Sequence, residues 1–311
     1  MGIFLRSDGR VRAWWRVAFF ALAIAAAGLV TSSVVDGIVS VTPVVGLARQ
    51  YGVPLAELGE VLALLIATYA ALRVVDGARD GAWARVGLDL RGLRLRPMLV
   101  GLAAGTLAIL VPCGVLIASG RLGFERQPAE ITSWWTAARG AFLVLMPAAF
   151  AEELAVRGYL LTTLIEGVGT PFAVAITSVL FAVLHLLNPD PTILSTLMVA
   201  VAGVFLATIR LTTGSLWAAS VAHLAWNLAQ AVALHAPVSG LPLPTPGYRL
   251  VDRGPGWLTG GPWGPEGGVA AAAGMLLAAL AMVKYFPRER GARSKPQPIQ
   301  REVHTKMTAQ T

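Results

Sequence analysis

The chain has 311 residues, of which 56% are hydrophobic and 14% are charged, and its mean hydropathy is +0.66. A soluble domain typically carries about 25% charged residues, so this composition excludes an ordinary soluble protein. The formal net charge of +8 is carried by the two ends, and the interior of the chain is neutral. Basic ends beside apolar runs are typical of a membrane protein, and we expect no nucleic-acid partner.

Eight apolar runs follow one another along the chain, and each approaches the roughly 20 residues that cross a bilayer as a helix. They cover about residues 17–35, 57–75, 98–119, 140–164, 171–187, 192–211, 215–235 and 267–285. Open strand edges are not tolerated in lipid, and the runs are too long for barrel strands. The sequence therefore predicts an all-α, polytopic transmembrane helical bundle of about eight spans, with an active site between helices within the membrane.

The distribution of Lys and Arg predicts the orientation. With eight spans both termini lie on one side, and that side receives eighteen basic residues against six on the other. We therefore expect a multi-pass protein of the plasma membrane with both termini cytoplasmic. The first run is read as a retained helix, because about 19 apolar residues exceed the usual 7–15-residue core of a signal peptide.

The single cysteine limits the possible disulfides and metal sites, and two glycines indicate how one helix packs. Cys113 is alone, so neither a disulfide within the chain nor a thiolate-rich metal site is possible. Gly101 and Gly105 are four apart in the third run, which predicts close helix packing within the bundle and leaves the oligomeric state open.

Three segments between or after the runs have their own character. Residues 76–97 alternate Leu with Arg and Asp, which fits either an interfacial segment with arginines on lipid phosphates or a plain charged loop. Residues 236–266 are rich in Pro and Gly and predict an irregular external loop with Trp257 and Trp263 near the membrane surface. Residues 287–311 predict a disordered basic tail.

Ionisable side chains at membrane depth usually mark function, because each costs several kcal/mol there unless it has a partner. The fourth run leads into Glu152, Glu153 and Arg157. Glu153 and Arg157 are four apart and share a helix face, which predicts an ion pair. Glu152 points about 100° away and is left as the chemical carboxylate. Pro147 predicts a kink that makes room for water.

Two further spans carry histidines. His185 lies in the fifth run with Phe181 one turn earlier, and His223 and Asn227 share a face in the seventh. A single polar site that includes Glu152 explains why three spans carry buried polar side chains more simply than three separate sites would. The remaining candidates are interpreted as helix-start or incidental residues: Glu57, Glu60, His235 and His304.

Two chemistries are open to this set. Glu152, His185 and His223 are the ligand types of a zinc ion that keeps a position for water. Alternatively, Glu152 acts as the general base on a water, and His223 and Asn227 hold the developing oxyanion. The contiguous motifs H-E-x-x-H and G-x-S-x-G do not occur, so soluble zinc-protease and serine-hydrolase readings fail.

The motifs E-E-x-x-x-R, F-x-x-x-H and H-x-x-x-N, in this order on successive predicted spans, resemble the CPBP group of intramembrane proteases. This group includes the type II CAAX prenyl endopeptidases and the bacteriocin-immunity (Abi) proteins, and the resemblance covers about residues 138–236. It implies a metalloprotease-type peptidase with a divalent metal, most readily zinc, held by Glu152, His185 and His223. By position it implies catalytic roles for Glu152, His185, His223 and Asn227, supporting roles for Glu153 and Arg157, and wall positions for Phe181 and Tyr159.

The resemblance divides the chain into three regions: N-terminal helices with an interfacial loop in 1–137, the protease-like core in 138–236, and an external loop, last helix and tail in 237–311. It implies an endopeptidase that acts on a membrane-associated or lipidated protein. The Ala, Gly and Arg richness favours a bacterial source, where prenylated substrates are not expected. A non-enzymatic immunity or scaffolding protein of the same fold is the alternative, and an ion-coupled transporter would need inverted repeats, which the sequence lacks.

One spacing restricts the geometry. His185 lies one turn before residues 188–191, an expected external turn, whereas Glu152 lies deep in its own span. The two can meet only if that turn sinks into the membrane. Irregular backbone is tolerated at that depth only where it is buried in protein or lines a water-filled cavity. We therefore predict a cavity beside this turn.

Overall fold

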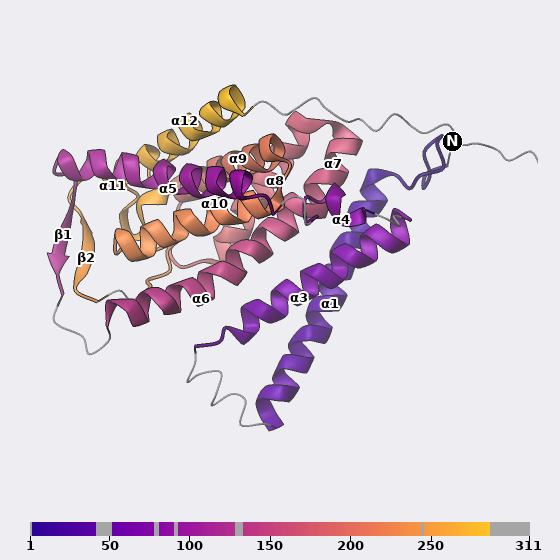
Figure 1. The fold of residues 1–311 in the computed structure, drawn as a ribbon, viewed down its shortest axis with the longest axis horizontal. Helices are drawn as coiled ribbons and strands as arrows, with labels where there is room; N and C mark the ends of the chain where they lie inside the picture. The colour runs from indigo at the N-terminus through magenta and orange to yellow at the C-terminus, as the bar shows by residue number, and fades with distance from the viewer. Residues whose placement is uncertain are drawn as a thin grey trace, which may run out of the picture.

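The computed structural model describes residues 2–41, 52–77, 81–89, 93–127, 133–243 and 246–286, and the predicted tail 287–311 lies outside them. Within this part the chain is mostly helical, as predicted (Figure 1). The long helices are α1 (Ala13–Val41), α3 (Leu55–Ala70), α5 (Leu95–Ala118), α6 (Trp134–Glu153), α8 (Thr170–Leu184), α9 (Ile193–Thr213), α10 (Leu216–Leu228) and α12 (Val269–Tyr285). Each of the eight predicted apolar runs coincides with one of them.

Shorter elements connect or extend these helices. The short helices are α4 (Ala82–Arg85), α7 (Leu161–Val168) and α11 (Gly256–Thr259). Wider π-helical turns continue three helices at Ala71–Val75, Leu154–Leu160 and Ala229–Ala233. Tighter 3₁₀ turns lie at His185–Leu187, Gly261–Trp263 and Pro265–Gly267.

Five stretches of the described chain are long and apolar enough to cross a membrane. They are Ala13–Ile38, Leu55–Val75, Leu95–Ala118, Thr170–Leu187 and Ile193–Thr213. The helix α12 is apolar but shorter. These lengths and compositions are those of a polytopic helical membrane protein, and the total of eight spans stays a prediction.

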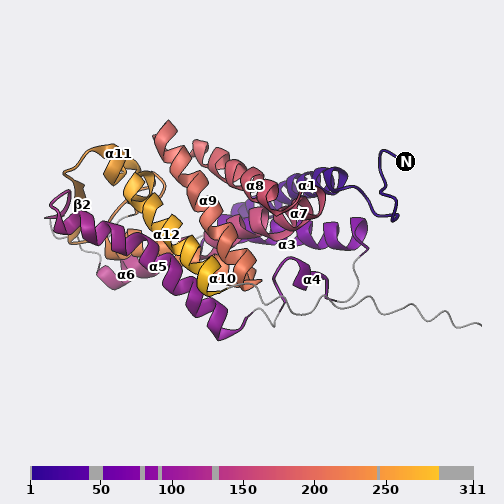
Figure 2. The same cartoon turned by 90° about the horizontal axis from the view of Figure 1, so that it is seen from above.

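The helices pack in two parts. Helices α1 and α3 run side by side and lean away from the rest of the bundle at their connected ends (Figure 1), and Figure 2 shows α5 and α12 crossing the opposite part. Ile109, Phe205 and Met275 are almost fully buried in one core cluster. They come from the three regions predicted from the sequence, so these regions share a hydrophobic core.

Helices α5 and α10 approach each other closely through glycine, as predicted. A Cβ atom on Gly101 would run into the backbone of Ala218, and one on Gly105 would run into the backbone of Ala222. Without side chains at these positions the helix backbones can lie in direct contact. This contact fixes the part of α10 that continues into His223.

A strand pair departs from the all-α prediction. Strand β1 (Leu122–Arg126) pairs antiparallel with β2 (Tyr248–Asp252), and Phe124 lies opposite Leu250. The predicted irregular loop at 236–266 is therefore partly ordered.

Trp257 is exposed, whereas Trp263 is only 3% exposed and lies within the protein. The predicted place of both near the membrane surface stays a prediction. The indole of Trp263 packs against Gly240 and Gly267, where the missing side chains leave room for it. The segment folds inward because these glycines let two stretches of backbone close around an aromatic ring.

Part of residues 76–97 packs against protein, which favours the charged-loop interpretation over the interfacial one for that part. Val86 and Leu88 lie in the protein core instead of facing lipid. Arg85 forms ion pairs with Asp76 at 2.8 Å and Glu166 at 2.5 Å. The arginine therefore has protein carboxylates as partners, and the segment folds back against α7.

The helix that contains Pro147 changes its backbone geometry further along the chain, and the kink predicted at Pro147 itself stays a prediction. Helix α6 continues through Pro147 without interruption. The backbone departs from helical geometry at Gly158, where φ is −77° and ψ is −111°, inside the π-helical turn Leu154–Leu160. This irregular turn follows directly after Glu152 and Glu153 and rotates every later residue of the segment.

Candidate active site

Three helices bring the predicted polar residues together. Glu152 lies near the end of α6, His185 directly follows α8, and His223 lies within α10. Oε2 of Glu152 is 3.8 Å from Nε2 of His185 and 3.9 Å from Nε2 of His223. One carboxylate oxygen therefore faces both imidazoles, which is the convergence that the sequence predicts.

The neighbouring carboxylate is directed elsewhere. Glu153 and Arg157 are both fully buried, and Nη1 of Arg157 donates to Oε1 of Glu153 at 2.9 Å. The guanidinium also lies 4.1 Å from the ring centre of Phe181 and donates to the carbonyl of Gly203 at 3.3 Å. The predicted ion pair is confirmed, and a cation–π contact adds to it.

Hydrogen bonds orient both imidazoles. Nδ1 of His185 lies 2.8 Å from the carbonyl oxygen of Phe181, and Nδ1 of His223 lies 3.1 Å from Oε1 of Glu153. Because a carbonyl and an ionised carboxylate can only accept, each Nδ1 carries the hydrogen. Both Nε2 atoms are thereby directed toward Glu152, and the partner of each Nδ1 fixes which nitrogen is free for chemistry.

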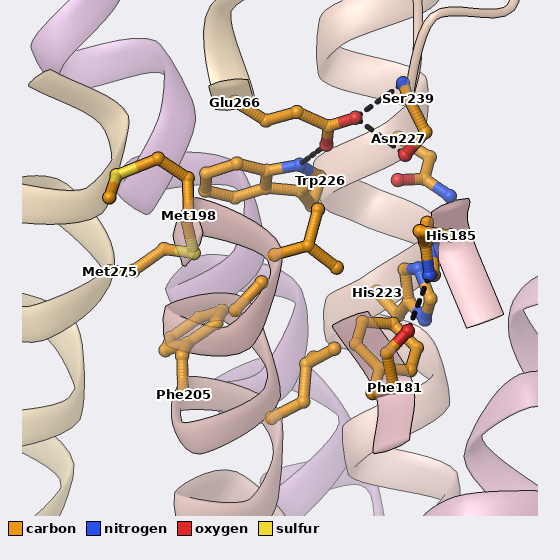
Figure 3. A pocket seen from close by; sticks show the side chains of 13 residues that line it. Phe181, His185, Met198, Phe205, His223, Trp226, Asn227, Ser239, Glu266 and Met275 are labelled. Carbon is orange, nitrogen blue, oxygen red and sulfur yellow. Dashed lines mark hydrogen bonds between the residues drawn. The ribbon is translucent and has the colours of Figure 1, made fainter. Parts of the chain in front are cut away.

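A cavity borders the histidines (Figure 3). Its wall is apolar on one side, with Phe205 and Met275, while His185, His223 and Asn227 line the other side. The volume open to the centre of a water molecule is about 30 Å³, above the roughly 10–15 Å³ that one water needs. Its remaining lining residues are Phe181, Met198, Val199, Ala202, Leu206, Trp226, Ser239 and Glu266.

The turn at 188–191, beside which a cavity is predicted, does not itself line the cavity, which His185 and Ser239 border on either side of it. Asn188 is half-buried, and its Nδ2 donates to the carbonyl oxygen of Ser239 at 3.0 Å. Pro189 and Asp190 are exposed, so only the first residue of the turn is covered. The segment that contains Ser239 covers Asn188, and in this way the turn after His185 is held against protein.

Of the two residues predicted to form the wall of the site, Phe181 lines the cavity and Tyr159 does not. The ring of Phe181 lies 4.6 Å from that of His185, centre to centre, and lines the cavity. Tyr159 is buried but is absent from the cavity wall, because its hydroxyl donates to Asp76 at 3.2 Å and accepts from Arg16 at 3.4 Å. The π-helical turn explains the difference, since one extra residue per turn rotates later side chains by roughly 100°.

The predicted metal ligands do not fit a zinc ion as they lie. Bonds of about 2.0–2.2 Å in tetrahedral geometry place neighbouring ligand atoms about 3.4 Å apart. The two distances from Glu152 to the imidazole nitrogens are longer, at 3.8 and 3.9 Å. No group of three or more His, Cys, Asp or Glu side chains in the described ranges is arranged to hold a metal ion. We therefore derive no catalytic step through a metal.

The acidic residue Glu266 lines this cavity and has no counterpart in the motifs. Glu266 is 7% exposed and accepts hydrogen bonds from Trp226 and Ser239. Its sequence signal is an acidic residue in W-G-P-E-G-G, immediately before the last apolar run. In a Pro- and Gly-rich loop no periodicity indicates which way such a side chain points.

The fold and the site together define a polytopic helical membrane protein in which Glu152 faces two histidines, and these histidines and Asn227 line one cavity. Residues 133–229, close to a third of the chain, match the family described as type II CAAX prenyl endopeptidase Rce1-like. This confirms the resemblance seen in the motifs, and the matched segment contains Glu152, His185 and His223. No curated protein and no solved structure matches the chain.

Proposed function

We propose that this protein is an intramembrane endopeptidase in which Glu152 activates a water molecule. The observation that supports this most strongly is the position of Oε2 of Glu152, which faces the free nitrogens of His185 and His223 beside a cavity with room for water. That oxygen is buried and has no hydrogen-bond partner within the described residues. A buried carboxylate oxygen without a partner indicates a group waiting for a ligand. The family match, which is to peptidases, agrees with this proposal.

The proposed reaction is hydrolysis by a general base. Glu152 takes a proton from the water, and the oxygen forms a bond to the carbonyl carbon of the peptide. The carbonyl oxygen becomes an oxyanion, which the side-chain amide of Asn227 can stabilise by donating a hydrogen bond. His223 can add a second hydrogen bond only in the form in which Nε2 carries a proton as well as Nδ1. The carbon–nitrogen bond then breaks, and Glu152 returns its proton to the leaving amine. The products are a new carboxyl terminus and a new amino terminus.

Glu153 and Arg157 have a supporting role in this proposal. Their ion pair fixes Oε1 of Glu153, which in turn holds Nδ1 of His223. A histidine whose other nitrogen is held by a carboxylate keeps its ring orientation and tautomer. Glu152 lacks such a partner and stays available for proton transfer.

The substrate class and location follow from the surroundings of the site. His185 lies in the stretch Thr170–Leu187, which is long and apolar enough to cross a membrane, and the stretch Ile193–Thr213 follows it. We therefore propose a membrane-associated or lipidated protein as the substrate. The excess of basic residues at both ends and in 73–96 supports a plasma-membrane protein with cytoplasmic termini.

Substrate identification is the first experiment. Cells that produce the wild-type chain or the Glu152→Gln variant are compared by mass spectrometry of membrane-protein termini. The proposal predicts new carboxyl termini with the wild type alone. Glu125→Gln is the matched control, because Glu125 is an exposed carboxylate on β1 that pairs with Arg249 and does not line the cavity.

The opposite outcome supports a different function. Identical termini in wild type and Glu152→Gln cells, with both proteins folded and equally abundant, would contradict the proposed proteolysis. The chain would then be better explained as a non-enzymatic immunity or scaffolding protein that retains the fold.

A further inference from the structure

Glu266 lies outside the segment that matches the protease family, yet it borders the same cavity as His185 and His223. Its carboxylate is buried, and three donors converge on it (Figure 3). Nε1 of Trp226 donates to Oε2 at 2.7 Å, and Oγ of Ser239 donates to Oε1 at 2.7 Å. The backbone N–H of Ser239 donates to the same Oε1. Hydrogen bonds to an ionised acceptor are about twice as strong as neutral ones.

The first contact connects Glu266 to the helix that carries the site. Trp226 directly precedes Asn227 on α10 and lies one turn after His223. Because Trp226 and Asn227 share one stretch of helix, a carboxylate that fixes the indole also restricts the rotation of α10 at the site.

The second contact connects Glu266 to the turn after His185. Ser239 donates twice to Glu266, and its carbonyl oxygen accepts from Asn188. Ser239 has a φ of +50°, a left-handed conformation that costs a residue other than Gly roughly 1 kcal/mol or more. Such a conformation persists when its surroundings enforce it, and the two donations to Glu266 do so.

Other contacts show that residues 237–241, the segment around Ser239, would remain in place without Glu266. Nε2 of Gln230 donates to the carbonyl of Pro237 at 2.9 Å, and the N–H of Gly240 donates to the carbonyl of Trp263 at 2.9 Å. Removal of the Glu266 carboxylate is therefore expected to loosen the position of Ser239 without unfolding the protein.

We propose that Glu266 is a positioning residue of the active site. It holds Ser239 and Trp226 together, and thereby places the turn after His185 relative to the segment of α10 with His223 and Asn227. The catalytic part of this proposal rests on the proposed function, whereas the structural part does not.

The test compares the full-length protein with Glu266→Ala, Glu266→Gln and a matched control. Asp252→Ala is the control, because Asp252 lies in the same external segment and also accepts from a hydroxyl and a backbone N–H, those of Thr259 and Gly254. Asp252 does not line the cavity. Hydrogen–deuterium exchange is measured in 185–192 and 237–241, and thermal unfolding shows that each variant is folded.

We expect Glu266→Ala to accelerate exchange about tenfold in both segments and to leave α1 and α3 unchanged. With a peptide that wild type cleaves and Glu152→Gln does not, we expect kcat to fall roughly 10- to 100-fold and KM to change less than threefold. Asp252→Ala should change neither quantity.

A double variant separates positioning from general loosening. In Glu266→Gln one amide NH₂ must face the N–H of Trp226 or of Ser239, so two donors oppose each other. Adding Trp226→Phe removes one of these donors. We therefore expect Glu266→Gln with Trp226→Phe to recover part of the kcat that Glu266→Gln alone loses.

Unchanged exchange in Glu266→Ala would overturn the proposal whatever the activity. Faster exchange with an unchanged kcat would overturn the positioning role. If wild type cleaves no peptide, the proposed function fails, and the exchange rates alone still decide whether Glu266 holds the two segments together.

Discussion

Oε1 of Glu153 lies 3.1 Å from Nδ1 of His223, so a carboxylate from the end of α6 sets the orientation of an imidazole on α10. The adjacent Glu152 points to the other side of that imidazole, with its Oε2 3.9 Å from Nε2. Two neighbouring carboxylates thus contact the two nitrogens of one histidine. One contact is a hydrogen bond, and the other is too long to be one.

Arg157→Met tests the buried ion pair. Removing the guanidinium leaves the charge of Glu153 buried with one fewer partner, and breaking a buried pair in this way costs about 3–5 kcal/mol. We expect a marked fall in the unfolding temperature in detergent. The double variant Glu153→Gln with Arg157→Met should lose less stability than the two single losses added together. Equal stability of Arg157→Met and wild type would contradict the role of this pair.

Gly105→Ala tests the close contact between α5 and α10. The added methyl group would overlap the backbone of Ala222, and such overpacking costs about 1–3 kcal/mol. We expect lower thermal stability and slower peptide cleavage, because His223 follows Ala222 directly. The control is Gly114→Ala on the same helix, where a Cβ has no neighbour within 4 Å. It should leave stability unchanged or raise it by up to about 1 kcal/mol. Equal effects of the two variants would contradict this packing.

Acid sensitivity is expected from the ion pairs that connect α1, α4 and α7. Burial alone would raise the pKa of Glu166, but Arg16 and Arg85 outweigh it and hold the pKa below its usual 4.5. A carboxyl group with a lowered folded-state pKa stabilises the protein above its unfolded pKa, and this stability is lost as the pH falls below 4.5. Arg16 contacts Glu166 at 2.6 Å and Asp76 at 2.7 Å, so both carboxylates belong to the same network.

Thermal unfolding as a function of pH checks this prediction. Glu166→Gln should be less stable than wild type at pH 7 and should lose less stability on acidification. The exposed pair of Glu125 and Arg249 provides the control, and Glu125→Gln should follow the wild-type curve. Parallel curves for wild type and Glu166→Gln would show that Glu166 does not contribute to the acid sensitivity.

Metal removal distinguishes the two chemistries that the sequence leaves open. In a reaction with Glu152 as the general base, treatment with a chelator should leave the cleavage rate within twofold of its initial value. Elemental analysis of the purified protein provides the second measurement. Near-stoichiometric zinc that disappears in Glu152→Ala and His223→Ala, together with activity lost on chelation, would establish the zinc site instead.

Much of the site could be predicted because helical spacing determines which side chains share a face. Four-residue spacing correctly predicts the pair of Glu153 and Arg157 and the separate direction of Glu152. The scarcity of ionisable groups in the spans then indicates that His185 and His223 belong with Glu152. The position of the two glycines on α5 was predictable for the same reason.

The errors arise where helical periodicity fails. Tyr159 lies seven residues after Glu152, so an unbroken α-helix would place both on nearly the same face. The π-helical turn Leu154–Leu160 turns Tyr159 toward α1 instead. Glu266 and Trp263 lie in a segment without any repeat, where glycine positions and contacts with distant residues determine the direction of each side chain.

Cleavage of an identified substrate peptide in H₂¹⁸O tests whether Glu152 activates the water. Purified wild type and Glu152→Gln are compared, with folding checked by thermal unfolding. We expect one ¹⁸O atom in the new carboxyl terminus with wild type and a rate at least about 100-fold lower with folded Glu152→Gln. A folded Glu152→Gln protein that cleaves at the wild-type rate would show that Glu152 is not the general base.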